Sequence, residues 1–288
     1  MVAFVNEEMW AIDGLPLSTW AYNIESIGGR QGIPTLAGDN YSVPYRAGEV
    51  WRSKMPAARM LSLGMWVRSS DAEGVTPKTA TGRRAQFNEN LRQLKNMFYD
   101  REQLLTLTKN VRYLTGIQAY TTQVECVSNL EPQMAGPNFG KMVVDLKMTD
   151  PYWTTGPLTT SGTISFGGTT IVNPGDDFTH RMSIQINPIF IGGGGSTTLR
   201  NNSYSPPISL SVPTPQPGIP WTVDVENFFL VRAGDLTTNW QNYINRSGPS
   251  AFWFEFKKGN NVISLDSRYG QGSFNNIQVI FTFYPLYL

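Results

Sequence analysis

The chain has 288 residues and a formal net charge of +1, since 23 Lys and Arg residues nearly balance 22 Asp and Glu residues. It lacks the basic excess that draws proteins to phosphate backbones or anionic lipids, so we expect neither sequence-specific nucleic-acid binding nor membrane insertion. The length predicts two domains, and the low charged fraction of 16% with 27 Gly and 19 Pro residues predicts a mainly β fold of short strands.

The first residues of the chain give no targeting signal. Residues 1–8 lack a basic start, and no apolar run of signal length follows them. No later segment is apolar enough to span a bilayer. We therefore expect the chain to be made and folded in a cytoplasm.

Strand patterns open the sequence. Residues 9–12 and 15–17 flank Asp13-Gly14, a dipeptide that tolerates positive φ and favours a two-residue hairpin turn. Between residues 61 and 67, apolar and smaller side chains alternate with the period of a strand that has one buried face. The sequence predicts a hairpin followed by a strand.

One stretch has a helical period. Phe87, Leu91, Leu94 and Phe98 recur at spacings of four, three and four between Gly82 and Asp100. The sequence therefore predicts one helix with one apolar stripe.

Strand patterns resume after this helix. They cover residues 104–108, 113–120, 122–127 and 142–149. Residues 154–162 are then small, polar and uncharged, a composition typical of a linker between folded units. We place the first domain at residues 1–153, the linker at 154–162 and the second domain at 163–288.

The second domain contains only strand-like pieces. Nine of them suggest a β-sandwich, at residues 163–166, 170–172, 182–186, 208–212, 222–225, 228–231, 252–256, 262–265 and 277–283. The glycine run 192–195 lacks the Lys-Ser or Lys-Thr of a phosphate-binding loop, so we interpret it as a surface loop.

The residues that commonly carry catalysis are scarce. Cys126 is the one cysteine and lies in an alternating strand, where a small buried thiol is expected. His180 is the one histidine, and no nucleophile motif accompanies it. We expect no catalytic residues, no metal site and no cofactor, and predict that the chain is not an enzyme.

Four carboxylates of the second domain are the remaining candidates for acid/base chemistry or calcium binding. Asp176 and Asp177 follow Asn-Pro-Gly and fit a solvated turn, and Asp224 and Glu226 alternate on one strand face. Structural roles are the simpler interpretation.

Aromatic residues offer a possible glycan site. Trp221, Trp240 and Trp253 could form a sugar-stacking platform, although core packing is the commoner role of such residues. In the segment 252–256, three Phe residues share one strand face and Trp253 takes the other. No ligand-binding residue can be assigned from this pattern.

The order of several landmarks resembles a known family. Asp13-Gly14, the segment 36–41, one helix and the run Asp150-Pro151-Tyr152 occur in the first half; Asn173-Pro174-Gly175-Asp176 and the segments 221–224 and 256–263 follow. In this order they resemble the distal tail proteins, or Dit-like minor tail proteins, of long, flexible-tailed bacteriophages. The resemblance covers nearly the whole chain.

The resemblance implies a fold and a function. The fold would be an N-terminal barrel- or sandwich-like hub domain with one α-helix, followed by a galectin-like β-sandwich of the jelly-roll type. The function would be that of a structural virion protein at the distal end of the tail, made in the host cytoplasm. Six copies would form a ring that joins the tail tube protein to the baseplate hub protein, with a channel for DNA and the tape measure protein.

Two alternatives stay open beside this interpretation. A carbohydrate-binding adhesin of the tail tip would have weak affinity for a host glycan in its second domain. A glycosidase or other tail-tip hydrolase is disfavoured, because the sequence shows no catalytic signature.

Overall fold

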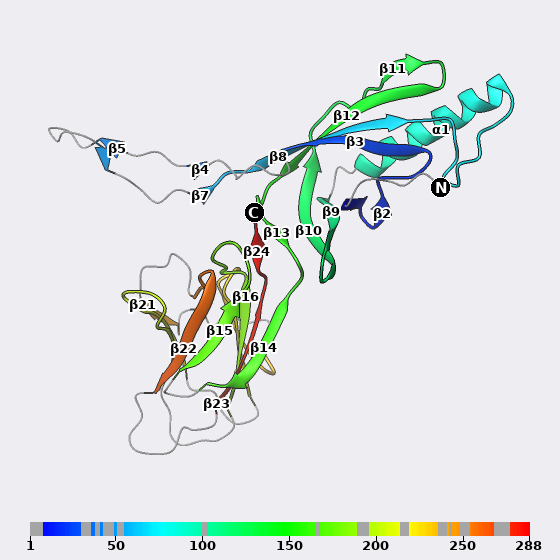
Figure 1. Ribbon diagram of the computed structural model, residues 1–288. Helices are drawn as coiled ribbons and strands as arrows, with labels where there is room; N and C mark the ends of the chain where they lie inside the picture. Colours follow the sequence, from blue (N-terminus) through cyan, green and yellow to red (C-terminus); the bar gives the residue numbers. More distant parts are fainter. Residues whose placement is uncertain are drawn as a thin grey trace. The chain divides into compact units, whose positions relative to one another are not determined.

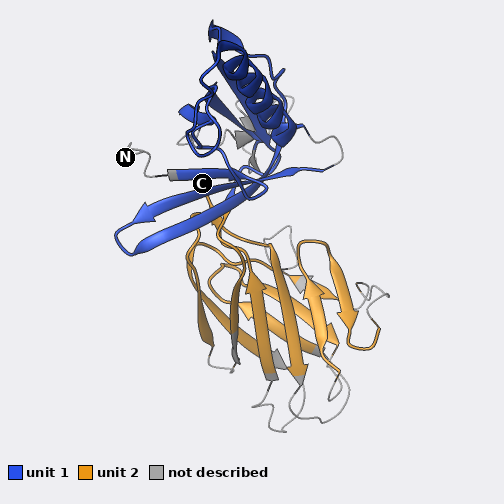
Figure 2. Ribbon diagram, turned by 90° about the vertical axis from the view of Figure 1, so that its right-hand side faces the viewer, with its two compact units in different colours: residues 1–153, 288 blue, residues 154–287 orange. Residues whose placement is uncertain are grey.

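The computed structural model describes residues 8–29, 36–37, 41–42, 49–50, 55–99, 103–164, 168–188, 196–213, 219–235, 241, 244–247, 254–267 and 277–288. These residues are mainly β, and α1 is the one α-helix among them, which confirms the predicted fold class (Figure 1). The chain divides into two compact units, Met1–Trp153 with Leu288 and Thr154–Tyr287 (Figure 2).

Unit 1 is built on one antiparallel sheet with the strand order β2-β1-β9-β10-β12-β8-β3, and β11 pairs with β12. β13 pairs with β10 in the same sheet, and two short ladders, β4 with β7 and β5 with β6, complete the described strands. The elements are β1 (Glu8–Ile12), β2 (Leu15–Pro16), β3 (Tyr22–Gly28), β4 (Leu36–Ala37), β5 (Tyr41–Ser42), β6 (Glu49–Val50), β7 (Met55–Pro56), β8 (Arg59–Val67), α1 (Ala80–Phe98), β9 (Leu105–Tyr113), β10 (Gly116–Cys126), β11 (Gln133–Gly136), β12 (Phe139–Met148) and β13 (Trp153–Thr154).

The predicted N-terminal hairpin is confirmed. Asp13 and Gly14 join β1 to β2 with φ angles of 46° and 79°, the left-handed pair that a two-residue turn requires. The turn is also attached to β9: Asp13 donates its N–H to the Thr106 carbonyl at 2.9 Å, and its Oδ1 accepts the Thr106 N–H at 2.8 Å. The hairpin therefore extends the sheet beyond β9.

Helix α1 covers the buried face of β8 and β12. Thr79 caps its N-terminus, where the Thr79 Oγ1 accepts the Gly82 N–H at 3.0 Å. Phe87, Leu94 and Phe98 are buried as predicted, but Leu91 is only half-buried. The fourth buried position is Asn90, so the predicted stripe is wrong at that point.

Asn90 is buried because the backbone satisfies its amide. Its Nδ2 donates to the carbonyls of Arg68 and Ser70, at 2.8 Å and 2.6 Å, and its Oδ1 accepts from Gln86 Nε2 at 2.9 Å. A buried amide with such partners avoids the desolvation cost of an unpaired polar group. Asn90 thus fixes α1 to the segment that leaves β8.

Unit 2 consists of two five-stranded antiparallel sheets. Their strand orders are β14-β23-β16-β19-β20 and β15-β22-β17-β18-β21. The elements are β14 (Leu158–Thr163), β15 (Thr169–Asn173), β16 (Met182–Pro188), β17 (Ser196–Asn201), β18 (Ile208–Pro213), β19 (Trp221–Asp224), β20 (Phe229–Arg232), β21 (Asn245–Ser247), β22 (Gly259–Ser267), β23 (Ile277–Phe283) and β24 (Leu286–Tyr287).

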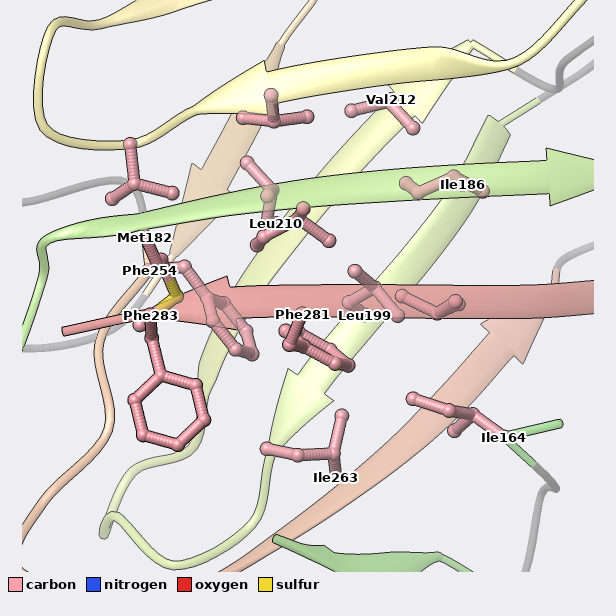
Figure 3. Packing of buried hydrophobic residues seen from close by; sticks show 14 of the residues in the cluster. Ile164, Met182, Ile186, Leu199, Leu210, Val212, Phe254, Ile263, Phe281 and Phe283 are labelled. Atoms are coloured by element: carbon pink, nitrogen blue, oxygen red, sulfur yellow. The ribbon is translucent and has the colours of Figure 1, made fainter. Parts of the chain in front are cut away.

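The two sheets of unit 2 share one apolar core, as a sandwich does. Ile186 and Phe281 of the first sheet lie against Leu199 and Leu210 of the second (Figure 3). The ring of Phe256 packs 5.3 Å from Phe281, centroid to centroid. The predicted β-sandwich is therefore what the described part of unit 2 forms.

Several boundaries in unit 2 differ from the sequence expectations. The segment expected as a linker, 154–162, contains most of β14, which pairs with β23. Strands β17 and β21 were not predicted. Of the strand expected at 252–256, only residues 254–256 are described, and they contribute an isolated bridge between Phe256 and Thr179. The glycine run 192–195 lies outside the described residues.

Candidate functional site

Cys126 is half-buried at the end of β10, not enclosed in the core as expected. Its Sγ lies 3.7 Å from the Ser128 Oγ, and both residues line a cavity of about 790 Å³ beside the end of α1. Phe98, Tyr99 and Leu104 also line this cavity. The thiol therefore faces a partly open surface.

His180 follows the bridge residue Thr179 and is half-buried beside Phe178, with the two ring centroids 6.3 Å apart. Burial lowers the pKa of His180 below its ordinary value of 6.5.

The four candidate carboxylates have separate structural contacts. Asp176 forms an ion pair with Lys258 at 3.4 Å, and Asp177 Oδ1 accepts the Phe178 N–H at 2.8 Å. The Asp224 side chain accepts hydrogen bonds from Asn227, and Glu226 forms an ion pair with Arg181 at 3.4 Å. Within the residues that the structure describes, no three metal-ligating side chains gather into a cluster.

The proposed aromatic platform is not assembled in the described part of unit 2. Trp221 is buried in the core, together with Phe254 and Phe256. Trp240, Phe252 and Trp253 lie outside the described residues. The structure thus assigns Trp221 to packing.

The distal half of the β9–β10 hairpin is strongly exposed among the described residues of unit 1. The strands turn at Leu114 and Thr115, inside the segment that the sequence analysis had interpreted as one strand over 113–120. Leu114 is fully exposed and Ile117 is 55% exposed. Figure 1 shows β9 and β10 extending past the other strands of this sheet. The glycine at position 116 was the available sequence signal for the turn. In the structure its φ is 139°.

A second surface lies on the face of β12, β8 and β3 that α1 does not cover. A cavity of about 440 Å³ is lined there by Glu25, Glu131, Lys141, Val143 and Asp145, among others. Lys141 and Glu25 form an ion pair at 2.7 Å, and Val143 is 56% exposed. This surface combines apolar area with an excess of carboxylates.

The described residues contain no helix that is long and apolar enough to cross a membrane. Their exposed features include an apolar hairpin tip and a partly acidic sheet face. No protein-family model matches the chain, and no curated protein matches its sequence.

The fold is that of a β-rich, two-unit protein with a single described helix, and solved structures share it. The crystal structure of the Dit protein (gp 19.1) of phage SPP1 matches with a TM-score of 0.63 and 14% identity, covering 96% of this chain and 98% of that chain. That protein is described as a paradigm of the hub adsorption apparatus in phages that infect Gram-positive bacteria. The family resemblance is therefore confirmed at the level of the fold.

Two structures of the phage p2 baseplate in its activated conformation also match. The structure with Sr has a TM-score of 0.41 and 8% identity over 96% of this chain and 97% of that chain. The structure with Ca has a TM-score of 0.38 and 9% identity over 96% of this chain and 98% of that chain.

Proposed function

We propose that the chain is a structural protein of a phage tail tip, of the distal tail kind. Six copies form a ring between the tail tube and the baseplate hub, and the ring leaves a channel through which DNA passes. The observation that carries the proposal is the fold shared with the SPP1 Dit protein along 96% of this chain.

The chemistry of the described residues supports a structural role. The acidic candidates are engaged in turns and ion pairs, and His180 packs beside an aromatic ring. The exposed features of unit 1 are apolar and charged surfaces, which suit protein–protein contacts. The chain accordingly acts by binding other chains.

The partners follow from this position in the virion. The ring contacts the tail tube protein on one face and the hub protein on the other, and the tape measure protein passes through its channel. Folding precedes assembly and takes place in the host cytoplasm.

The purified full-length chain tests the proposal. Mass photometry over a range of concentrations should show a species of six subunits, and negative-stain images should show rings. Antibody labelling of virions should place the chain at the distal end of the tail. Monomers at every concentration would contradict self-assembly, and label confined to the capsid would contradict the location.

A further inference from the structure

We propose that the tip of the β9–β10 hairpin of one copy docks on the uncovered face of β12, β8 and β3 of the next copy. The inference rests on the proposed ring and deepens it by naming the two surfaces that meet. We call them the hairpin tip (residues 111–118) and the acceptor face, which comprises Met60, Glu25, Glu131, Lys141, Val143 and Asp145.

Among the residues that the structure describes, no element packs over either face of the hairpin tip. Between Leu107 and Thr122 every side chain is at least partly exposed, on both faces of the hairpin. The described pairing of β1 with β9 ends at Val111, so beyond this residue the described strands form a two-stranded ribbon, which is only marginally stable in water without a packed face. Tyr113, Leu114 and Ile117 together expose an apolar patch of the kind that marks a binding surface.

The charges of the two surfaces are complementary. The hairpin tip, residues 111–118, has one cation, Arg112, and no carboxylate, which gives a net charge of +1. The cavity of the acceptor face is lined by three carboxylates and one ammonium group, which gives −2. Opposite potentials favour this pairing and fix its register.

The acceptor face also offers apolar area beside these charges. Val143 and Met60 are 56% and 48% exposed, and strand pairing places both on the face that α1 leaves open. The cavity of about 440 Å³ gives room for a branched side chain such as Leu114. A second copy is thus the occupant that charge and shape favour.

The two surfaces lie on different strands, so the contact is head-to-tail. Such a heterologous contact propagates from copy to copy and closes into a ring when the rotation permits. A self-complementary contact would instead stop at a dimer.

Crosslinking tests the contact in the full-length chain. In a Cys126→Ser background, Leu114→Cys combined with Val143→Cys should give a ladder of disulfide-linked multimers under mild oxidation. Either single cysteine should give dimers at most. Absence of the ladder from the double variant, in a preparation that forms rings, would overturn the proposal.

A charge exchange gives a second test that does not depend on oxidation. Arg112→Glu and Glu131→Arg should each raise the concentration for half-assembly by about tenfold or more, and the double variant should restore it. Lys78→Glu, on an exposed site of the same unit, should have no effect. If wild-type chains form rings that neither charge reversal weakens, the proposed contact surfaces are wrong, but the proposed ring is not contradicted. If wild-type chains never assemble, both proposals fall.

Discussion

At the scale of single residues, Leu94 and Leu91 provide a matched pair on α1. Leu94 is completely buried, whereas Leu91 is half-buried one turn away. We predict that Leu94→Asp lowers the free energy of unfolding by about 4 kcal/mol, because it places an unpaired charge in the core. Leu91→Asp should cost about 1–2 kcal/mol, since its carboxylate can reach water. Urea unfolding measures both, and equal losses would contradict the burial difference.

This helix also shows what the sequence can reveal about a buried stripe. The spacing of Phe87, Leu94 and Phe98 predicted three of its members. Asn90 was missed because its partners are the carbonyls of Arg68 and Ser70, some 20 residues earlier in the chain. Helical periodicity records side-chain polarity and contains no information on such distant acceptors.

His180 should make stability depend on pH. Burial lowers its pKa in the folded chain below the ordinary value of 6.5, so the unfolded chain takes up a proton first as the pH falls. The stability present above pH 6.5 is therefore lost as the pH decreases toward the folded pKa. Because His180 is the one histidine of the chain, the His180→Gln variant removes this pH-dependent contribution to stability.

Thermal melting at a series of pH values measures this effect. Between about pH 7 and pH 5 the wild-type melting temperature should fall more steeply than that of His180→Gln. Carboxylates contribute equally to both proteins, so the difference isolates the imidazole. Parallel curves would show that burial of His180 does not affect folding.

At the scale of elements, the β1–β2 turn allows the cost of an unfavourable backbone conformation to be tested separately from side-chain contacts. Gly14 has a φ of 79°, and a Cβ at this position would meet no atom within 4 Å. We expect Gly14→Ala to cost about 1 kcal/mol, since L-residues disfavour this conformation. Gly136 has equally open surroundings without a positive φ, so Gly136→Ala should be close to neutral. Equal costs for the two variants in chemical unfolding would show that the turn conformation is not what Gly14 provides.

Strand β17, which the sequence did not predict, has polar residues on its buried face. Thr197 and Asn201 of β17 are buried beside Leu199, and Asn201 Nδ2 donates to the Glu255 carbonyl at 2.9 Å and to Asn261 Oδ1 at 3.1 Å. Strand β14 has five small residues after Leu158, which is also the composition of a linker. Alternating apolar patterns predicted β8, β12, β16 and β23, because the buried faces of these strands consist of apolar side chains.

At the scale of the whole molecule, the division after Trp153 predicts independent folding. We expect fragments 1–153 and 154–287 each to be soluble and to unfold cooperatively, since each has its own buried core. A cut at residue 160 would remove the start of β14, so the junction at 153 is the better choice. Calorimetry checks this, and a fragment without a melting transition would contradict it.

The same fragments locate the assembly function. Both surfaces of the proposed contact belong to unit 1, so fragment 1–153 should form rings while fragment 154–287 stays monomeric. Light scattering across a range of concentrations distinguishes them. A ring-sized 154–287 fragment beside a monomeric 1–153 fragment would reverse the assignment. Measurable affinity of 154–287 for a host glycan would support the adhesin alternative.

The candidate binding surfaces could not be predicted from the sequence. Cys126, His180 and the four carboxylates were the residues that chemistry singles out, and the structure distributes them among separate contacts. The hairpin tip and the acceptor face are separated along the chain, and their complementarity concerns two copies. A single sequence encodes both surfaces but does not indicate that they meet.

The position of β23 has a consequence for synthesis on the ribosome. This strand lies between β14 and β16, so the sheet that begins at Leu158 is joined only when residues 277–283 emerge. The seven strands on the main path of the sheet of unit 1 all lie before residue 149, so most of this sheet can form first. A chain interrupted before Ile277 would keep the main strands of unit 1 but expose unpaired edges on β14 and β16, which invite aggregation. We expect host proteases to remove such truncated chains before they can enter a growing virion.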